Sequence, residues 1–201
     1  MRIEPLLEAY AEIARGEILR EFGIESCIAS TRITLEVMKK LKVPVKPLPT
    51  RLCAMNVVMA RLIEEHGWPD PKTLDRWVEE HNAHSIGLGY GPPTPDDPGW
   101  DGHLVAFVGG RYIVDASIDQ VNRPQKEISV PDVIVAKIER GFITGKRPLL
   151  VRLSSAVLRY EVMTPPDLGY RSSPNWRLRY QTQPAVERIL AELRERSEDR
   201  R

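Results

Sequence analysis

Three residues of this chain could together activate a thiol for attack on a carbonyl carbon: Cys27, His103 and Asp115. Cys27 stands at the predicted start of an amphipathic helix, where the helix dipole favours the thiolate, the form of the thiol that attacks. His103 begins a predicted strand and can exchange a proton with the thiol. Asp115 ends the next strand, where a carboxylate can fix the tautomer and orientation of the imidazole. These residue types predict a Cys-His-Asp site that works through a covalent acyl-enzyme.

The two strands that carry the imidazole and the carboxylate are predicted to form a hairpin. Residues 103–108 and 111–116 are rich in β-branched and other apolar side chains and flank Gly109-Gly110. Because side chains alternate between the two faces of a strand, His103 and Asp115 share a face only if the turn contains an odd number of residues. A three-residue turn with a glycine in the left-handed region satisfies this condition. We therefore expect Asp115, rather than the nearby Asp119, to orient His103.

The helices that must position the thiol come first in the chain. Residues 4–22 carry apolar side chains at helical spacing and end at Gly23. Ser26 is predicted to cap a second helix by accepting a backbone N–H, which places Cys27 in the first turn. Pro44 ends this second helix.

The positions of prolines and glycines and the spacing of apolar residues predict the remaining elements. Residues 43–53 contain several prolines, which lack the N–H of a sheet ladder, so we expect an edge strand and not a central one. Pro184 is predicted to open a last helix, whose apolar face needs a partner in this domain or in a second subunit, so a homodimer through this helix is one alternative. Further helices are expected at 55–66 and 71–82, and further strands at 86–90, 149–153 and 157–163.

Two loops could shape access to the site. The Pro- and Gly-rich residues 91–101 include Trp100, directly before His103, so this loop is expected at the rim of any site built on His103. We expect Trp100 and Ser26 to contact substrate or form part of a lid. Residues 164–177 form a second loop, which carries Trp176.

Composition limits the classes of protein that fit. The 201 residues are 42% hydrophobic and 28% charged with a formal net charge of +1, so no strong field would attract nucleic acid or an anionic membrane. We expect residues 1–180 to form a single domain, followed by a C-terminal helix and charged tail over 181–201. No stretch is apolar enough to span a bilayer, so a cytoplasmic protein is expected, with Cys27 and Cys53 reduced and Cys53 in the core. The four histidines are scattered, and no metal site is predicted.

Three short windows resemble the transglutaminase-like branch of the papain-like cysteine enzymes: Ser26-Cys27 with its helix, Gly102-His103, and Val114–Ser117. The resemblance implies an α+β fold in which N-terminal helices, with the cysteine at a helix start, pack on an antiparallel sheet that carries the histidine and the aspartate. It implies that Cys27 is the nucleophile, His103 the general base and later the acid, and Asp115 the orienting group. The substrate would be a peptide or another amide or ester, the acyl group would pass to water or to an amine, and no cofactor would be needed.

A function of a different class stays open beside this one. A non-catalytic binding or assembly protein could keep the papain-like fold and use the loops of Trp100 and Trp176 as its contact surface.

Overall fold

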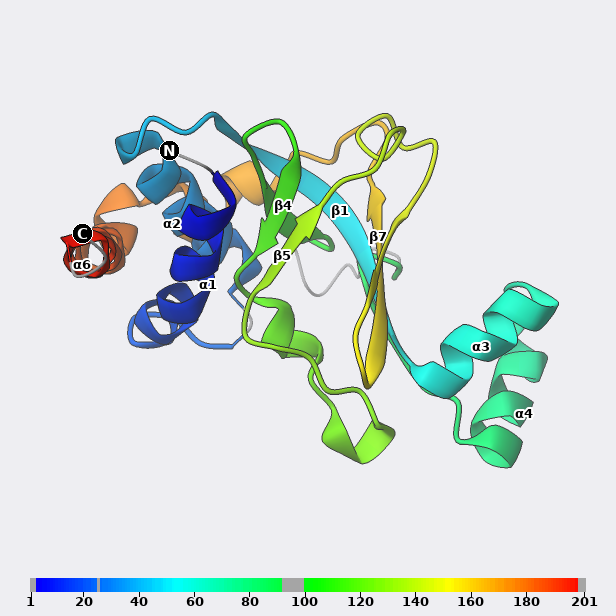
Figure 1. The fold of residues 1–201 in the computed structure, drawn as a ribbon. Helices are drawn as coiled ribbons and strands as arrows, with labels where there is room; N and C mark the ends of the chain where they lie inside the picture. The colour runs from blue at the N-terminus through cyan, green and yellow to red at the C-terminus, as the bar shows by residue number, and fades with distance from the viewer. Residues whose placement is uncertain (1–2, 25, 92–99, 199–201) are drawn as a thin grey trace.

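The computed structural model describes residues 3–24, 26–91 and 100–198, and shows a mixed α/β protein with one antiparallel sheet (Figure 1). Seven strands form the sheet: β1 (Val45–Asn56), β2 (Ser85–Leu88), β3 (His103–Val108), β4 (Tyr112–Asp115), β5 (Ile134–Lys137), β6 (Leu149–Arg152) and β7 (Ala156–Val162). The α-helices are α1 (Ile3–Leu19), α2 (Cys27–Lys40), α3 (Val57–His66), α4 (Pro71–His81), α5 (Pro174–Arg177) and α6 (Arg179–Glu198). The described residues also form the short 3-10 turns η1 (Ile118–Val121), η2 (Pro124–Lys126) and η3 (Gly169–Ser172).

The long strand β1 lies at the centre of the sheet, which runs in the order β5-β4-β3-β1-β7-β6, with β2 also paired to β1. Residues 45–50 of β1 pair with β3, residues 52–55 with β2, and residues 50–56 with β7. The prediction that the proline-rich segment forms an edge strand is therefore wrong.

The prolines themselves explain why a central position is tolerated. Pro49 accepts a hydrogen bond from the amide of Met163, which follows β7, so the backbone groups of Pro49 face the β7 side of β1. Pro47 lies two positions earlier and faces the same side. The pairing with β7 starts only at Thr50, so neither proline removes a donor from a ladder.

The hairpin of β3 and β4 has the predicted odd-numbered turn. Val108 pairs with Tyr112, which leaves three residues in the turn, and Gly109 and Gly110 have φ values of 60° and 70°. Glycine adopts this left-handed region without the steric cost that a side chain brings. With this register, His103 and Asp115 lie on the same face of the sheet.

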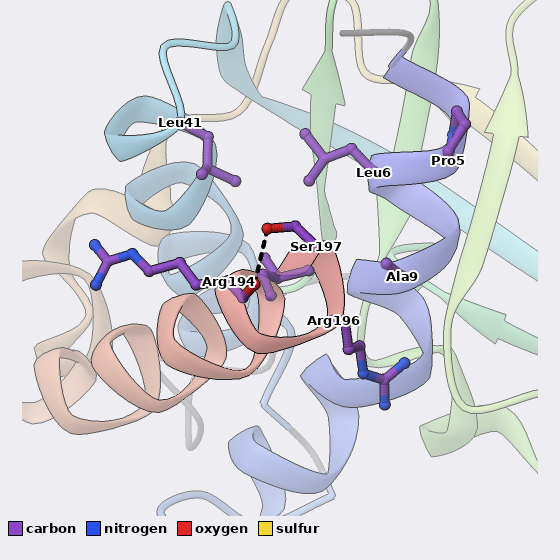
Figure 2. A pocket seen from close by; sticks show the side chains of 8 residues that line it. Pro5, Leu6, Ala9, Leu41, Arg194, Arg196 and Ser197 are labelled. Atoms are coloured by element: carbon purple, nitrogen blue, oxygen red, sulfur yellow. Dashed lines mark hydrogen bonds between the residues drawn. The ribbon is translucent and has the colours of Figure 1, made fainter. Parts of the chain in front are cut away.

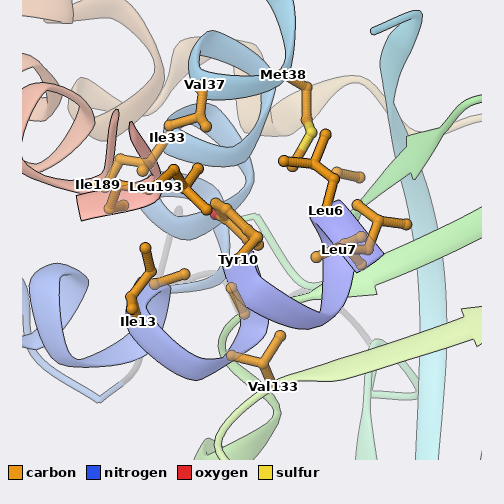
Figure 3. Packing of buried hydrophobic residues seen from close by; sticks show 14 of the residues in the cluster. Leu6, Leu7, Tyr10, Ile13, Ile33, Val37, Met38, Val133, Ile189 and Leu193 are labelled. Carbon is orange, nitrogen blue, oxygen red and sulfur yellow. The ribbon is translucent and has the colours of Figure 1, made fainter. Parts of the chain in front are cut away.

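Helices α1, α2 and α6 pack together and cover one face of the sheet near β3 and β4 (Figure 1). Figure 3 shows the packing of these three helices, with Tyr10 of α1 close to side chains of the other two. The apolar face of α6 is therefore buried against its own domain, the first of the two predicted alternatives. Buried members of this cluster include Leu6, Leu7, Tyr10, Ile13, Ile33, Val37, Met38, Val133, Ile189 and Leu193.

One expectation about this half of the molecule, the start of the last helix, needs correction. Helix α6 begins at Arg179 and contains Pro184 in its interior, so Pro184 does not open it. Helix α6 shares a hydrophobic core with α1 and α2. Helices α3 and α4 agree with the predicted ranges within two residues, and they extend from the far end of β1, away from α6 (Figure 1).

The opposite face of the sheet has its own core. Leu52, Val105 and Ile113 are fully buried there with Phe142 and Tyr160. Strand β5 was missed because its four residues follow irregular chain without a clear alternation. The predicted 91–101 loop lies mostly outside the described residues. Among the described helices, none is long and apolar enough to cross a membrane.

Candidate functional site

His103 and Asp115 form a buried pair at the end of the β3–β4 hairpin. The distance from His103 Nε2 to Asp115 Oδ2 is 2.6 Å, and the side chains of both residues are completely buried. Both project from the face of the sheet that carries Val105 and Ile113, as the alternation along each strand requires. The structure thus brings together two of the three residues singled out in the sequence.

The Asp115 carboxylate is surrounded by donors. The hydroxyl of Tyr160 donates to Oδ2 at 3.0 Å, and the backbone amide and hydroxyl of Ser117 lie 3.2 and 3.3 Å from Oδ1. Burial alone would raise the pKa of Asp115, but the charge of His103 and these hydrogen bonds outweigh it and hold the pKa below the usual value. Asp115 is therefore ionised at neutral pH.

The pairing with Asp115 also changes the pKa of the His103 imidazole. Burial would lower the pKa of His103, but the charge of Asp115, its hydrogen bond and a further hydrogen bond with Cys27 raise the pKa to about 10. His103 therefore carries a positive charge at neutral pH. Because Nε2 is held by Asp115, Nδ1 is the nitrogen that remains for Gln120 and for the thiol of Cys27.

Cys27 is the first residue of α2 and is only partly buried, so solvent and small molecules can reach it. The second cysteine differs in location and exposure. Cys53 lies in β1 and is buried, and burial is the main cause that raises its pKa to about 11. The two thiols thus provide an internal comparison between a cysteine at a pocket and a cysteine in the core.

Ser26 precedes Cys27 but does not cap α2 through its side chain. Its hydroxyl instead accepts a hydrogen bond from the guanidinium of Arg15 at 3.1 Å and lies 3.3 Å from the hydroxyl of Ser30. The predicted capping contact is therefore wrong, because the buried Arg15 of α1 takes the serine oxygen.

Arg15 also binds the carboxylate of Asp119. Nε of Arg15 donates to Oδ2 of Asp119 at 2.9 Å, and Nη2 lies 2.7 Å from Oδ1, so the two side chains form a salt bridge with one hydrogen bond. The same guanidinium donates to the carbonyl of Ile24, just before Ser26. Asp119 therefore links η1 to α1 and to the entry of α2, while His103 is left to Asp115.

Two further residues reach the site that sequence reasoning did not single out, Gln120 and Arg123. Nε2 of Gln120 lies 3.1 Å from Nδ1 of His103. The amide nitrogen suits a neutral ring, whereas the charged ring needs the amide turned so that Oε1 accepts from Nδ1–H. In the sequence, Gln120 and Arg123 follow the strand that ends at Asp115. This position alone does not show that they reach the site, because that depends on how the chain folds after the strand.

A pocket of about 360 Å³ opens over Cys27. Its walls combine the start of α2, the strand β2, the end of the 91–101 loop and the segment around η1. The lining residues are Ser26, Cys27, Ile28, Ile86, Leu88, Trp100, Gly102, Gln120, Arg123 and Asn175. The two residues expected to contact substrate, Trp100 and Ser26, are both among them.

Trp100 is closely packed against two glycines and an aromatic side chain. A Cβ atom on Gly102 or Gly169 would meet carbons of the indole at 2.3 and 2.8 Å, so both glycines are required for its position. The Trp100 ring also packs edge-on against Tyr170 at 5.5 Å, and Tyr170 packs against Trp176 at 4.7 Å. The loops of Trp100 and Trp176 thus form one aromatic wall.

A second hollow of about 330 Å³ lies between α1, α2 and α6 (Figure 2). Its lining has no cysteine, histidine or carboxylate, and consists of Pro5, Leu6, Ala9, Leu41, Leu193, Arg194, Arg196 and Ser197. Of these two pockets, only the one over Cys27 has a cysteine in its lining. Among the described residues, no cluster of three or more His, Cys, Asp or Glu side chains could hold a metal ion.

Comparison of the chain with protein-family models, with curated proteins and with solved structures finds no match.

Proposed function

We propose that this protein is a cysteine-dependent acyl-transfer enzyme of the transglutaminase-like, papain-like kind, which acts on an amide or ester carbonyl. The observation that carries the proposal is the continuous chain of contacts from Cys27 to His103 to Asp115, with a buried ion pair at one end and a pocket at the other. Two opposite charges in the interior are costly to desolvate, so an arrangement of this kind is typical of functional sites.

In the first step, the Cys27 thiolate attacks the carbonyl carbon, and a carbon–sulfur bond forms. His103 then gives its Nδ1 proton to the leaving amine or alcohol as the carbon–nitrogen or carbon–oxygen bond breaks. The high pKa of His103 supports this order, since the ring holds its proton at neutral pH before the substrate arrives.

In the second step, neutral His103 takes a proton from water or from an acceptor amine, which attacks the thioester and releases Cys27. Asp115 keeps Nε2–H in place throughout, so that Nδ1 alone exchanges the proton. Hydrolysis and transfer to an amine require the same three residues.

Limiting iodoacetamide, followed by peptide mass spectrometry of the native protein, tests the proposal. We expect rapid labelling of Cys27 below neutral pH and almost none of Cys53. Slow labelling of Cys27, at a rate similar to Cys53, would contradict the proposal. That outcome would favour the binding protein that uses the aromatic wall of Trp100, Tyr170 and Trp176 as its contact surface.

A further inference from the structure

The pocket over Cys27 has an uneven distribution of charge. Arg123 is the one lysine or arginine among its described lining residues, and none of those lining residues is an aspartate or glutamate. A cationic side chain in a wall whose described residues include no aspartate or glutamate makes the pocket attractive to an anion.

Arg123 is fixed in orientation by backbone carbonyl groups. Its Nη1 atom donates to the carbonyl oxygens of Gln120 and Asn122 at 3.0 and 2.8 Å. Its backbone pairs with Ile128 in an isolated bridge, which closes the turn around η2. Within the described part of the chain, Arg123 forms no ion pair with an aspartate or glutamate, in contrast to Arg15, Arg32 and Arg188.

The rest of the pocket limits the size and polarity of the ligand. A volume of about 360 Å³ is small for a ligand site, and Ile28, Ile86 and Leu88 give it an apolar wall. Gln120 connects the two ends of the site, since its side chain reaches His103 and its carbonyl holds Arg123. The reacting carbonyl and an anionic group of the substrate can therefore be bound by consecutive parts of one segment.

We propose that the substrate is a compact amide with a free carboxylate close to the reacting carbonyl, such as a short peptide or an acylated amino acid, and that Arg123 binds this carboxylate. Guanidinium matches carboxylate in geometry and forms strong charge-assisted hydrogen bonds with it. This inference rests on the proposed function, because it assumes that Cys27 is the reacting group.

Two alkylating reagents that differ only in charge test the inference without knowledge of the natural substrate. N-iodoacetyl-glycine carries a carboxylate, and N-iodoacetyl-glycinamide carries a neutral amide in its place. In both, the Cys27 sulfur forms a bond to carbon and iodide leaves. The measured quantity is the ratio of the two labelling rates at Cys27, the acid over the amide.

We expect Arg123→Gln to lower this ratio about tenfold, as the loss of one charge-assisted contact implies, with little change in the rate of the neutral reagent. The matched control is Arg61→Gln, which removes the same charge from an exposed position on α3 and should leave the ratio unchanged. His103 keeps its charge in both variants, so its own attraction for the acid cancels. A ratio that is the same in wild type and Arg123→Gln would overturn the inference.

A second measurement needs no variant. Unreactive N-acetyl-glycine should protect wild-type Cys27 from the neutral iodoacetyl reagent, and N-acetyl-glycinamide should not. Equal protection, or none from either, would contradict the role of Arg123. Fast labelling of Cys27 without charge preference would overturn only this inference, whereas slow labelling of Cys27 by both reagents would overturn the proposed function as well.

Discussion

Tyr160 donates its hydroxyl to Oδ2 of Asp115, the same oxygen that contacts His103. Tyr160 comes from β7 and Asp115 from β4, on opposite sides of β1 and β3 in the sheet. The carboxylate is thus held from three directions, by the histidine, by the tyrosine and by Ser117. A carboxylate held in this way can keep the imidazole in one orientation during both steps of the proposed reaction.

Removal of the Tyr160 hydroxyl should weaken the orienting group without loss of ring packing. We expect Tyr160→Phe to lower the free energy of unfolding by about 1–2 kcal/mol, the cost of a lost hydrogen bond to a charged group, and to slow labelling of Cys27 by iodoacetamide. Chemical denaturation and labelling kinetics measure the two effects. Tyr10→Phe is the matched control, since Tyr10 is a buried tyrosine bonded to Thr34 away from the site. A Tyr10→Phe variant with equally slow labelling would show that the effect is not local.

Substitution of Cys27 should affect activity, whereas substitution of Cys53 should affect stability. Cys27→Ala should abolish acyl transfer and change the free energy of unfolding by less than about 1 kcal/mol, because the side chain is partly exposed. Cys53→Ala should keep the activity and lose about 1–2 kcal/mol of stability, since it leaves a small cavity in β1 packing. Thermal melting and an esterase assay check both variants. Full activity in Cys27→Ala would exclude this residue as the nucleophile.

Substitution of Asp115 should affect reactivity, whereas substitution of Asp119 should affect stability. Asp115→Asn should slow labelling of Cys27 and any turnover by orders of magnitude, because it removes the charge that fixes the His103 tautomer. Asp119→Asn leaves the buried Arg15 without its charged partner, so the variant should lose on the order of 2–3 kcal/mol of stability. Its labelling rate at a temperature where it is folded should stay close to wild type. The reverse ranking would move the orienting role to Asp119.

The pH dependence of stability should report the charge on His103. Its pKa in the folded protein is about 10, above the ordinary value of 6.5, so between these values the folded state binds more protons than the unfolded chain. This contribution to stability is complete below the lower value and is lost as the pH rises through the higher one. We expect the free energy of unfolding to fall by up to about 1.4 kcal/mol per pH unit in this window, and His103→Gln to remove that slope. Chemical denaturation of wild type and His103→Gln at a series of pH values measures the two slopes. Equal slopes in the two proteins would contradict a positive charge on His103.

Much of the arrangement was accessible from the sequence because it depends on local rules. Alternation along β3 and β4, together with two glycines in the turn, predicted that Asp115 and His103 share a face. Helical periodicity and prolines placed α2, α3 and α4 within a few residues of their bounds. These features depend on neighbours in the chain, so short windows contain the information.

The parts that were missed depend on contacts between distant segments. Arg15 and Ser26 meet through tertiary packing, and no local pattern shows that an arginine will take the capping oxygen. The central position of β1 is possible because its pairing with β7 starts only at Thr50. Pro47 and Pro49 therefore remove no hydrogen-bond donor from the ladder. Gln120 of η1 reaches the imidazole through a contact with the first residue of β3, which lies 17 residues earlier in the chain.

Trapping of the acyl-enzyme tests the central claim most directly. Brief exposure to 4-nitrophenyl acetate, an acid quench and peptide mass spectrometry would locate the acetyl group in wild type, Cys27→Ala and His103→Ala. We expect one acetyl group per chain on Cys27, none there in Cys27→Ala, and acetylation slowed by orders of magnitude in His103→Ala. Acetylation of Cys53 instead of Cys27, or an unchanged rate in His103→Ala, would contradict a nucleophile at Cys27 that is activated by His103.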